Sequence, residues 1–328
     1  MDTESNTIRA IDFTKVPALE LSRAQIDEHT SDGGKTEGGK LWIHIDRTSE
    51  ESADWLANGS GLDSHTVGAL LAQTTRPRVE YFDTGILLTL RGVNLNENAD
   101  PADMISLRMW VDPNRLITVY RERLRAIDSA HEKVIGQTAP MSISELCVVI
   151  LKGLTLRAGP IIDEINDRLD VMEEHLIDPN RVLDRTDLLD LRQDAIMLHR
   201  YIKPQRDVVF DLYETKHEMF DDQHAPVLKE IINLLTRFVE DLEAARGRTM
   251  LIQDELSNQY AERLNSRMYA VTMVATILLP MSILTGLLGV NVGGVPFAGS
   301  GYGFWIVCFV LVLMGLAGYL VVRMCKWL

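Results

Sequence analysis

The 328-residue sequence predicts an α/β domain with a mainly antiparallel sheet, followed by a long helix and two membrane-spanning helices. Three observations lead to this fold class. Residues 41–120 contain β-hairpin patterns, the apolar residues follow a helical period from about residue 142, and two uncharged apolar runs lie near the end. The domain that precedes the apolar runs is expected in the cytoplasm, as their flanking charges indicate below.

The predicted strands alternate with turn signals. LWIHID at 41–46 has strand character, VEYFDTGILLTLRGV forms two runs around Asp83-Thr84-Gly85, and ISLRMWVDPNRLITVY forms two more around Asp112-Pro113-Asn114. Short helices are predicted over 52–62 and 64–73, and the composition of 29–40 predicts a mobile loop.

Three helices are predicted after residue 142. The first carries apolar residues at threes and fours over 161–176, with a kink near Gly159-Pro160, and the second does so over 188–198. The third starts near Pro226, which suits a first helical turn, and keeps a heptad rhythm up to residue 256. No proline follows until Pro280, so one helix is expected over 226–288, as in the stalk of an oligomer.

The two apolar runs are long enough to cross a bilayer. Residues 269–288 and 304–322 are uncharged, and about 20 helical residues span the hydrocarbon core. Arg263 and Arg267 precede the first run, and Arg323 and Lys326 follow the second. The positive-inside rule then places both chain termini in the cytoplasm and the connecting loop outside. Two core helices of a soluble protein are the alternative interpretation.

These boundaries divide the chain into six predicted segments. They are a cytoplasmic α/β domain with a helical hairpin (1–225), a stalk helix (226–268), a first transmembrane helix (269–288), an external loop (289–303), a second transmembrane helix (304–322) and a basic cytoplasmic tail (323–328).

Charge separates the same two parts of the chain. The protein has 33 Lys and Arg against 47 Asp and Glu, yet residues from Arg263 onward include four basic residues and no acidic one. An acidic body repels nucleic acid and attracts cations, so nucleic acid is not an expected partner. The sequence begins with neither a basic nor an apolar segment, so a cleaved signal peptide is not expected.

Enzyme and structural-zinc motifs were sought and not found. The sequence contains no GxGxxG or GxxxxGK[ST] loop and no nucleophile elbow, so an enzyme is not predicted. Its three cysteines, Cys147, Cys308 and Cys325, have no paired spacing, which suits a reducing compartment.

The tail resembles a known family. A long helix that becomes the first span, LLGVN at its end, a short external loop, a second span and a terminal KWL are similar to the CorA family of divalent-cation channels and transporters. The family tripeptide is usually GMN, and here it is Gly289-Val290-Asn291. This substitution, the neutral GGVP that follows, TRPRVE at 75–80 and YIKPQRDV at 201–208 resemble the zinc-transporting ZntB branch.

The resemblance implies a homopentamer in the bacterial inner membrane, with a funnel-shaped cytoplasmic domain and a pore lined by the first span. Asn291 would form the external mouth, where five carboxamides accept hydrogen bonds from the waters of a hydrated ion, an outer-sphere contact. Gly289 would let the helix end turn, and Val290 would point away and pack. Asn265, Leu279 and Ser282 are the further pore-facing residues that the family implies. The alternatives are a helix cap for Asn291 and packing against the second span for Leu279 and Ser282.

Two acidic regions are weaker metal candidates. His217, Asp221 and His224 lie within KHEMFDDQH, where a four-residue spacing suits zinc on a helix face, although a solvated acidic corner is the simpler interpretation. On the stalk, Asp254 best matches the position of a regulatory cation site between subunits.

The leading functional hypothesis is zinc transport, with Zn²⁺ as the transported ion and no organic cofactor, and with coupling to protons left open. A Mg²⁺ or Co²⁺ channel of the same fold is the nearest alternative. A membrane-anchored signalling protein that transports nothing is the third. Between Arg267 and Arg323 there is no Asp, Glu, His or Lys, so an intramembrane carboxylate relay for protons is excluded.

Overall fold

The computed structural model describes residues 7–30, 39–73, 76–177, 184–215, 217–220, 222–290, 296 and 299–324. The chain divides into two compact units, Met1–Ile252 and Gln253–Leu328. The predicted fold class is confirmed, because the first unit is α/β and the chain ends in a long helix followed by a second apolar helix.

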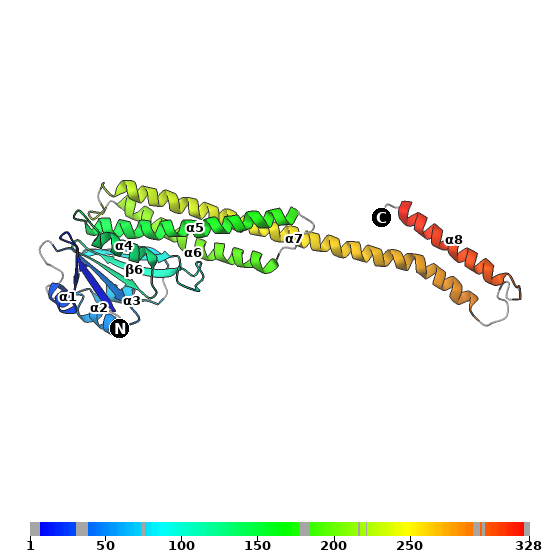
Figure 1. Ribbon diagram of the computed structural model, residues 1–328, viewed down its shortest axis with the longest axis horizontal. Coiled ribbons are helices and arrows are strands. Elements are labelled where there is room, and N and C mark those ends of the chain that lie inside the picture. The colour runs from blue at the N-terminus through cyan, green and yellow to red at the C-terminus, as the bar shows by residue number, and fades with distance from the viewer. Residues whose placement is uncertain are drawn as a thin grey trace. The chain divides into compact units, whose positions relative to one another are not determined.

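A seven-stranded mixed sheet forms the centre of the first unit (Figure 1). The strand order is β2-β1-β3-β7-β6-β5-β4, and every neighbouring pair is antiparallel except β3 with β7. The strands are β1 (Ile8–Asp12), β2 (Leu19–Leu21), β3 (Leu41–Asp46), β4 (Arg78–Phe82), β5 (Gly85–Gly92), β6 (Ile105–Val111) and β7 (Arg115–Tyr120).

The five strands expected from hairpin patterns are all present, and the turns lie where the sequence placed them. A buried network closes the β6–β7 turn: Asp112 accepts hydrogen bonds from the backbone N–H groups of Asn114 and Arg115, and its carboxylate lies 2.7 Å from Arg115 Nε. The Trp110 indole N–H also donates to Asp112, at 3.0 Å. The Asp-x-Asn-Arg sequence therefore fixes the hairpin with one carboxylate.

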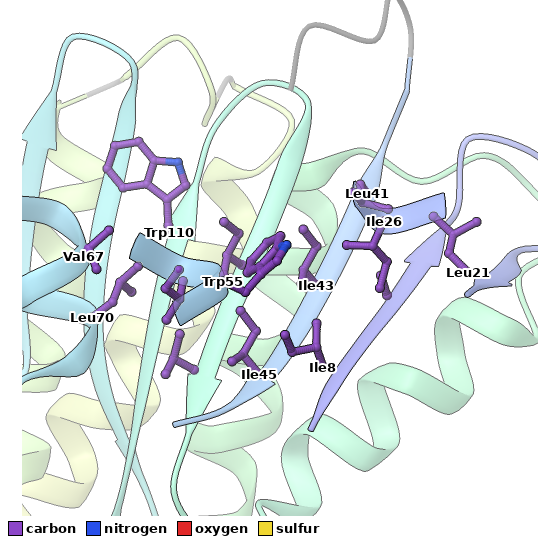
Figure 2. Packing of buried hydrophobic residues seen from close by; sticks show 14 of the residues in the cluster. Ile8, Leu21, Ile26, Leu41, Ile43, Ile45, Trp55, Val67, Leu70 and Trp110 are labelled. Atoms are coloured by element: carbon purple, nitrogen blue, oxygen red, sulfur yellow. The ribbon is translucent and has the colours of Figure 1, made fainter. Parts of the chain in front are cut away.

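Three short helices cover one face of the sheet. They are α1 (Arg23–Thr30), α2 (Glu50–Asn58) and α3 (Ser64–Leu71), so His29, expected in a mobile loop, belongs to a helix. Residues 31–38 of that loop lie outside the described residues. Figure 2 shows the core beneath these helices, where Trp55 of α2 lies beside Ile43 and Ile45 of β3, and Val67 and Leu70 of α3 lie toward Trp110 of β6.

The other face of the sheet packs against α5 (Ile143–Ile177), and α4 (Arg125–Ile135) packs on α5. Helix α5 then runs beside α6 (Arg185–Thr215) and the first part of α7 (Ala225–Leu288) (Figure 1). Ion pairs join these helices: Arg248 of α7 contacts Asp170 and Glu173 of α5 at 2.5 and 2.7 Å. Helix α5 continues through Pro160, and a Cβ at Gly159 would come within 3.3 Å of Phe238 of α7.

The second unit contains the rest of α7 and helix α8 (Gly303–Met324). The single helix predicted over 226–288 is confirmed, since α7 runs to Leu288 and contains Pro280. Both α7 and α8 are long and apolar enough to cross a membrane. Among the described side chains beyond Ile252, none is buried in one chain.

Candidate functional site

Helix α8 packs on one narrow face of α7. A Cβ at Gly318 would lie 3.2 Å from Ile277 Cγ1, and a Cβ at Gly315 would lie 3.9 Å from Met281 Sδ. Small residues let two helices approach closely in a membrane, where packing replaces the hydrophobic effect as the source of association. The two glycines of α8 therefore fix which side of α7 is covered within one chain.

The predicted pore residues lie on another face of α7. At 3.6 residues per turn, Leu279, Ser282 and Gly286 stand about 200°, 140° and 180° around the helix from Ile277. Leu279 is 65% exposed, and nothing lies within 4 Å of a Cβ placed on Gly286. Asn265, further down the helix, is also exposed. In one chain these residues do not pack against α8, so their face is available to other copies or to a passage.

The face that contains Leu279 and Ser282 carries no charge. Hydroxyl groups elsewhere on the same stretch of α7 are satisfied by the helix itself: Thr276 donates to the carbonyl of Thr272 at 2.8 Å, and Thr285 donates to that of Met281 at 3.0 Å. Such bonds allow threonine to reside in an apolar helix without an unpaired hydroxyl. This part of α7 can therefore lie in a membrane. Its uncharged stripe, formed by Leu279, Ser282 and Gly286, offers an ion no fixed charge.

Helix α7 ends at Leu288, directly before the predicted Gly289-Val290-Asn291 motif. The Gly289 N–H donates to the Thr285 carbonyl at 2.9 Å, which prolongs the helical pattern by one bond. A Cβ on Gly289 would lie only 3.1 Å from that same carbonyl oxygen. Gly289 does not adopt the left-handed conformation, so crowding against Thr285 explains the glycine here. Val290 is 47% exposed in one chain, and Asn291 lies outside the described residues.

Among the described residues, the weaker metal candidates do not come together at one site within one chain. The ring of His217 stacks on Tyr81 with centroids 5.8 Å apart, and its Nδ1 accepts from the Met219 N–H at 3.3 Å. His224 meets Phe220 edge to face, and Asp221 lies outside the described residues. Within the described part of the chain, no three His, Cys, Asp or Glu residues gather as a metal site. Asp254 is exposed on α7.

Sequence reasoning did not identify the helix contact that orients the site. Gly315 and Gly318 stand three residues apart in α8, a small-residue pattern that predicts close helix packing in membranes. That signal marks the face of α8 that contacts α7, whereas the Ile277 face of α7 on the other side of the contact is found only in the structure.

Comparisons with known proteins identify the class and then the family. The model of the CorA-like Mg²⁺ transporter protein family matches residues 37–323. The divalent cation transporter CmaX of Pseudomonas aeruginosa is 37% identical over 292 residues, 88% of this chain and 87% of CmaX. The zinc transport protein ZntB of Yersinia pseudotuberculosis is 32% identical over 287 residues, 88% of each chain. The structure of full-length CmaX superposes with a TM-score of 0.82 at 34% identity, covering 98% of this chain and 97% of that one.

The match to the family model and the similarity to CmaX define the class as a membrane transporter and not an enzyme. The chain belongs to the CorA family of divalent-cation transporters.

Proposed function

We propose that this protein carries divalent cations, with Zn²⁺ as the principal ion, through a pore formed by α7 from five copies of the chain. The observation that carries the proposal is the exposed, uncharged stripe of α7 at Leu279, Ser282 and Gly286, on the side away from α8. The arginines that flank both spans favour a cytoplasmic location for both termini, in a bacterial inner membrane.

Five copies are proposed because one chain leaves its second unit uncovered. Leu264, Val271 and Leu279 of α7 are 61%, 71% and 65% exposed in one chain. Lipid can cover some of this surface, but a pore requires neighbouring copies of α7 around a common axis. Cation channels commonly combine hydrophobic constrictions with polar rings in this way.

The proposed mechanism keeps the ion hydrated at the entrance. A dication binds its waters too strongly for one ring of neutral side chains to replace them. Five Asn291 carboxamides would accept hydrogen bonds from those waters, and the uncharged stripe below would offer weak sites that release the ion. Because Asp, Glu, His and Lys are absent between Arg267 and Arg323, any proton coupling would act at the cytoplasmic end or through the hydrated ion.

Zinc is proposed on two grounds, the similarity to ZntB over most of the chain and the valine in the GVN tripeptide. The family description favours Mg²⁺ instead, so a Mg²⁺ or Co²⁺ channel is the alternative. The similarity to CmaX supports divalent cations as a class without choosing among them.

Flux into proteoliposomes tests the proposal. The full-length protein should admit Zn²⁺ to an enclosed metal-sensitive dye faster than Mg²⁺ or Co²⁺ at equal concentration. Asn291→Ala should reduce this flux to near the level of empty liposomes, whereas Asn291→Gln, which keeps a carboxamide, should retain part of it. Val312→Ala on α8 serves as the control, since Val312 is 70% exposed and belongs to the other helix.

Each result has a distinct consequence. Preference for Mg²⁺ or Co²⁺ would replace zinc by the alternative ion and leave the pore intact. Full flux in Asn291→Ala would mean that the asparagine only caps the helix. Absence of flux for all three ions would leave a membrane-anchored protein without transport, and would contradict the proposal.

A further inference from the structure

Four arginines surround one cavity in the first unit, far along the sequence from the ion pathway. Arg47, Arg91, Arg108 and Arg121 line a space of about 320 Å³, together with Ser106, Asn94 and Tyr201. The protein as a whole has a net charge of −14, so this concentration of positive charge runs against its composition.

The sheet brings the four arginines together at one end of strands β3, β7, β6 and β5. Arg47 and Arg121 directly follow β3 and β7, which are parallel and end side by side at Asp46 and Tyr120. Arg91 lies near the end of β5, directly across from Ser106 at the start of β6, and Arg108 lies two residues further along β6. Carboxyl ends of adjacent parallel strands are a common place for ligands in α/β proteins. The arginines therefore meet because of strand register.

The guanidinium groups of this cavity are held in place by main-chain oxygens. Arg47 Nη1 and Arg108 Nη2 both donate to the carbonyl of Ala72, the residue that caps the C-terminus of α3. Arg91 Nη1 donates to the Met104 carbonyl at 2.7 Å, and its guanidinium lies 4.5 Å from the ring centre of Tyr201. The described contacts of Arg47 use only Nη1, which leaves its Nη2 and Nε donors for a ligand.

These positive charges act on one another. Arg108 is 1% exposed, and burial together with Arg47, Arg91 and Arg78 lowers its pKa to about 10. Burial and the charge of Arg121 lower the pKa of Arg47 as well. Asp103 and Glu122 also line the cavity, but neither forms an ion pair with an arginine among the contacts of the described residues. The cluster therefore costs electrostatic energy that an anion would relieve.

A neutral donor completes the lining. Ser106 Oγ is buried and has no hydrogen-bond partner among the described residues, although unpaired buried hydroxyls are uncommon in native proteins. A hydroxyl beside several guanidinium groups suits a tetrahedral oxyanion, whose oxygens accept several hydrogen bonds from different directions. Arginine is also the side chain whose geometry best matches phosphate.

We propose that this arginine cavity binds a small phosphate-type anion, either free phosphate or pyrophosphate or the phosphate group of a nucleotide. A volume of about 320 Å³ is near the lower end for small-molecule sites and accepts a pyrophosphate with some water. Arg47, Arg91, Arg108 and Arg121 contact the oxygens, and Ser106 donates its hydroxyl hydrogen to one of them. The site is separate from the ion pathway and does not depend on which cation is transported.

Thermal unfolding of the full-length protein in detergent tests the site, with EDTA present throughout so that removal of divalent ions cannot contribute. Phosphate, pyrophosphate or ATP should raise the midpoint of unfolding in a saturable way, whereas sodium chloride at equal ionic strength should not. A larger rise with ATP than with pyrophosphate would identify a nucleotide as the source. The reverse would identify the free anion.

Variants decide whether the cavity is responsible. Arg121→Gln at an exposed position and Arg47→Gln should each weaken pyrophosphate binding about tenfold or more, because each loses a charge-assisted hydrogen bond. Arg123→Gln is the control. Arg123 lies two residues after Arg121, and its guanidinium pairs with Asp128, so this variant removes the same charge without changing the lining of the cavity. Equal pyrophosphate binding in Arg121→Gln, Arg123→Gln and the wild type would overturn the proposal, as would an equal response to chloride. The Arg121 variant keeps the test valid if Arg47→Gln folds poorly.

Discussion

The two units of this chain treat apolar side chains in opposite ways. In the first unit Leu107, Leu116 and Val119 are completely buried between the sheet and its helices. In the second unit Val271, Phe304 and Val312 are 71%, 71% and 70% exposed, although the sequence there is far more apolar. The first unit contains its own core, whereas the described part of the second unit leaves its large apolar side chains uncovered within one chain.

Polar groups show the same difference. The first unit pairs the buried Arg115 with Asp112, and joins its long helices through arginine, lysine and histidine contacts. The described part of the membrane hairpin between Arg267 and Arg323 has no charged side chain, and the hydroxyls of Thr276 and Thr285 are bonded to their own helix. Changes in the first unit should therefore alter folding, and changes on the exposed face of α7 should alter transport.

The largest effect is expected where a charge is buried. Asp112→Ala should lower the free energy of unfolding of the first unit by about 3–5 kcal/mol, because Arg115 and the Trp110 N–H lose their partner in a buried site. Urea unfolding followed by far-UV circular dichroism would measure the loss. Asp128→Ala breaks an exposed pair with Arg123 and should cost at most about 1 kcal/mol. Equal losses in the two variants would show that burial does not set the cost.

Substitutions at two glycines of the second unit, Gly318 and Gly286, distinguish helix packing from ion passage. Gly318→Leu should push α8 away from Ile277 and destabilise the hairpin by about 1–3 kcal/mol, as overpacking does. Gly286→Leu meets nothing within 4 Å in one chain, so it should leave the hairpin stable while its bulk narrows the proposed passage and reduces flux. Thermal unfolding and flux, measured on both variants, give the comparison. Undiminished flux in a stable Gly286→Leu protein would argue that this face lines no passage.

Acid should weaken the first unit through His44. Burial, Arg9 and His131 lower the pKa of His44 from 6.5 to about 3. Between pH 6.5 and 3, His44 is therefore protonated in the unfolded chain but not in the folded chain. The free energy of unfolding falls as the pH drops through this range, by up to about 1.4 kcal/mol per pH unit. In His44→Gln this part of the pH dependence should disappear.

The pH comparison has to be made between variants, because another group acts in the opposite direction. Burial and Asp100 raise the pKa of Asp194 to about 6. The folded chain therefore binds this proton more readily than the unfolded chain, and Asp194 increases the free energy of unfolding as the pH falls below 6. Asp194 is present in both proteins, and the difference between wild type and His44→Gln at pH 7 and pH 5 isolates the histidine. Identical pH dependence in the two proteins would contradict the assignment.

The smallest effect is expected at the surface ion pairs of the long helices. Arg248→Ala removes contacts of 2.5 and 2.7 Å to Asp170 and Glu173, yet those carboxylates are 65% and 44% exposed. The loss should stay at about 1 kcal/mol or less and shrink further in high salt. Thermal unfolding in low and high salt measures it. A loss as large as that of Asp112→Ala would mean that this contact is shielded from water in the assembly.

The strands with strong local signals could be predicted from the sequence, and those without them could not. The hairpins around residues 83–85 and 112–114 combine turn residues with β-rich flanks, and they are present. Strands β1 and β2 are five and three residues long, and the pairing of β1 with β3 and of β2 with β1 is a tertiary effect that a short segment does not encode. Helix α4 was also not predicted, although its apolar residues Ile127, Ala130 and Val134 follow a helical period.

The candidate sites were predictable to different degrees. The spacing of Leu279 and Ser282 along α7 and the motif after Leu288 are visible in the sequence, so the sequence alone predicts the ion pathway. Arg91 and Arg108 lie inside apolar strands, where the sequence suggests only a solvent-facing position. The strand register alone brings them together with Arg47 and Arg121.

The proposed ion passage requires that the uncharged stripe of α7 at Leu279, Ser282 and Gly286 faces water. Single cysteines at Leu279 and Ser282 test this, in a chain whose Cys308 and Cys325 are replaced by serine. Cys147 can remain, because burial raises the pKa of its thiol to about 12 and keeps it unreactive. A charged, membrane-impermeant thiol reagent should modify Leu279→Cys and Ser282→Cys and stop cation flux, while Val312→Cys on α8 stays unmodified and conducting. Modification of Val312→Cys alone, or of none of the three, would contradict a water-filled passage along this face of α7.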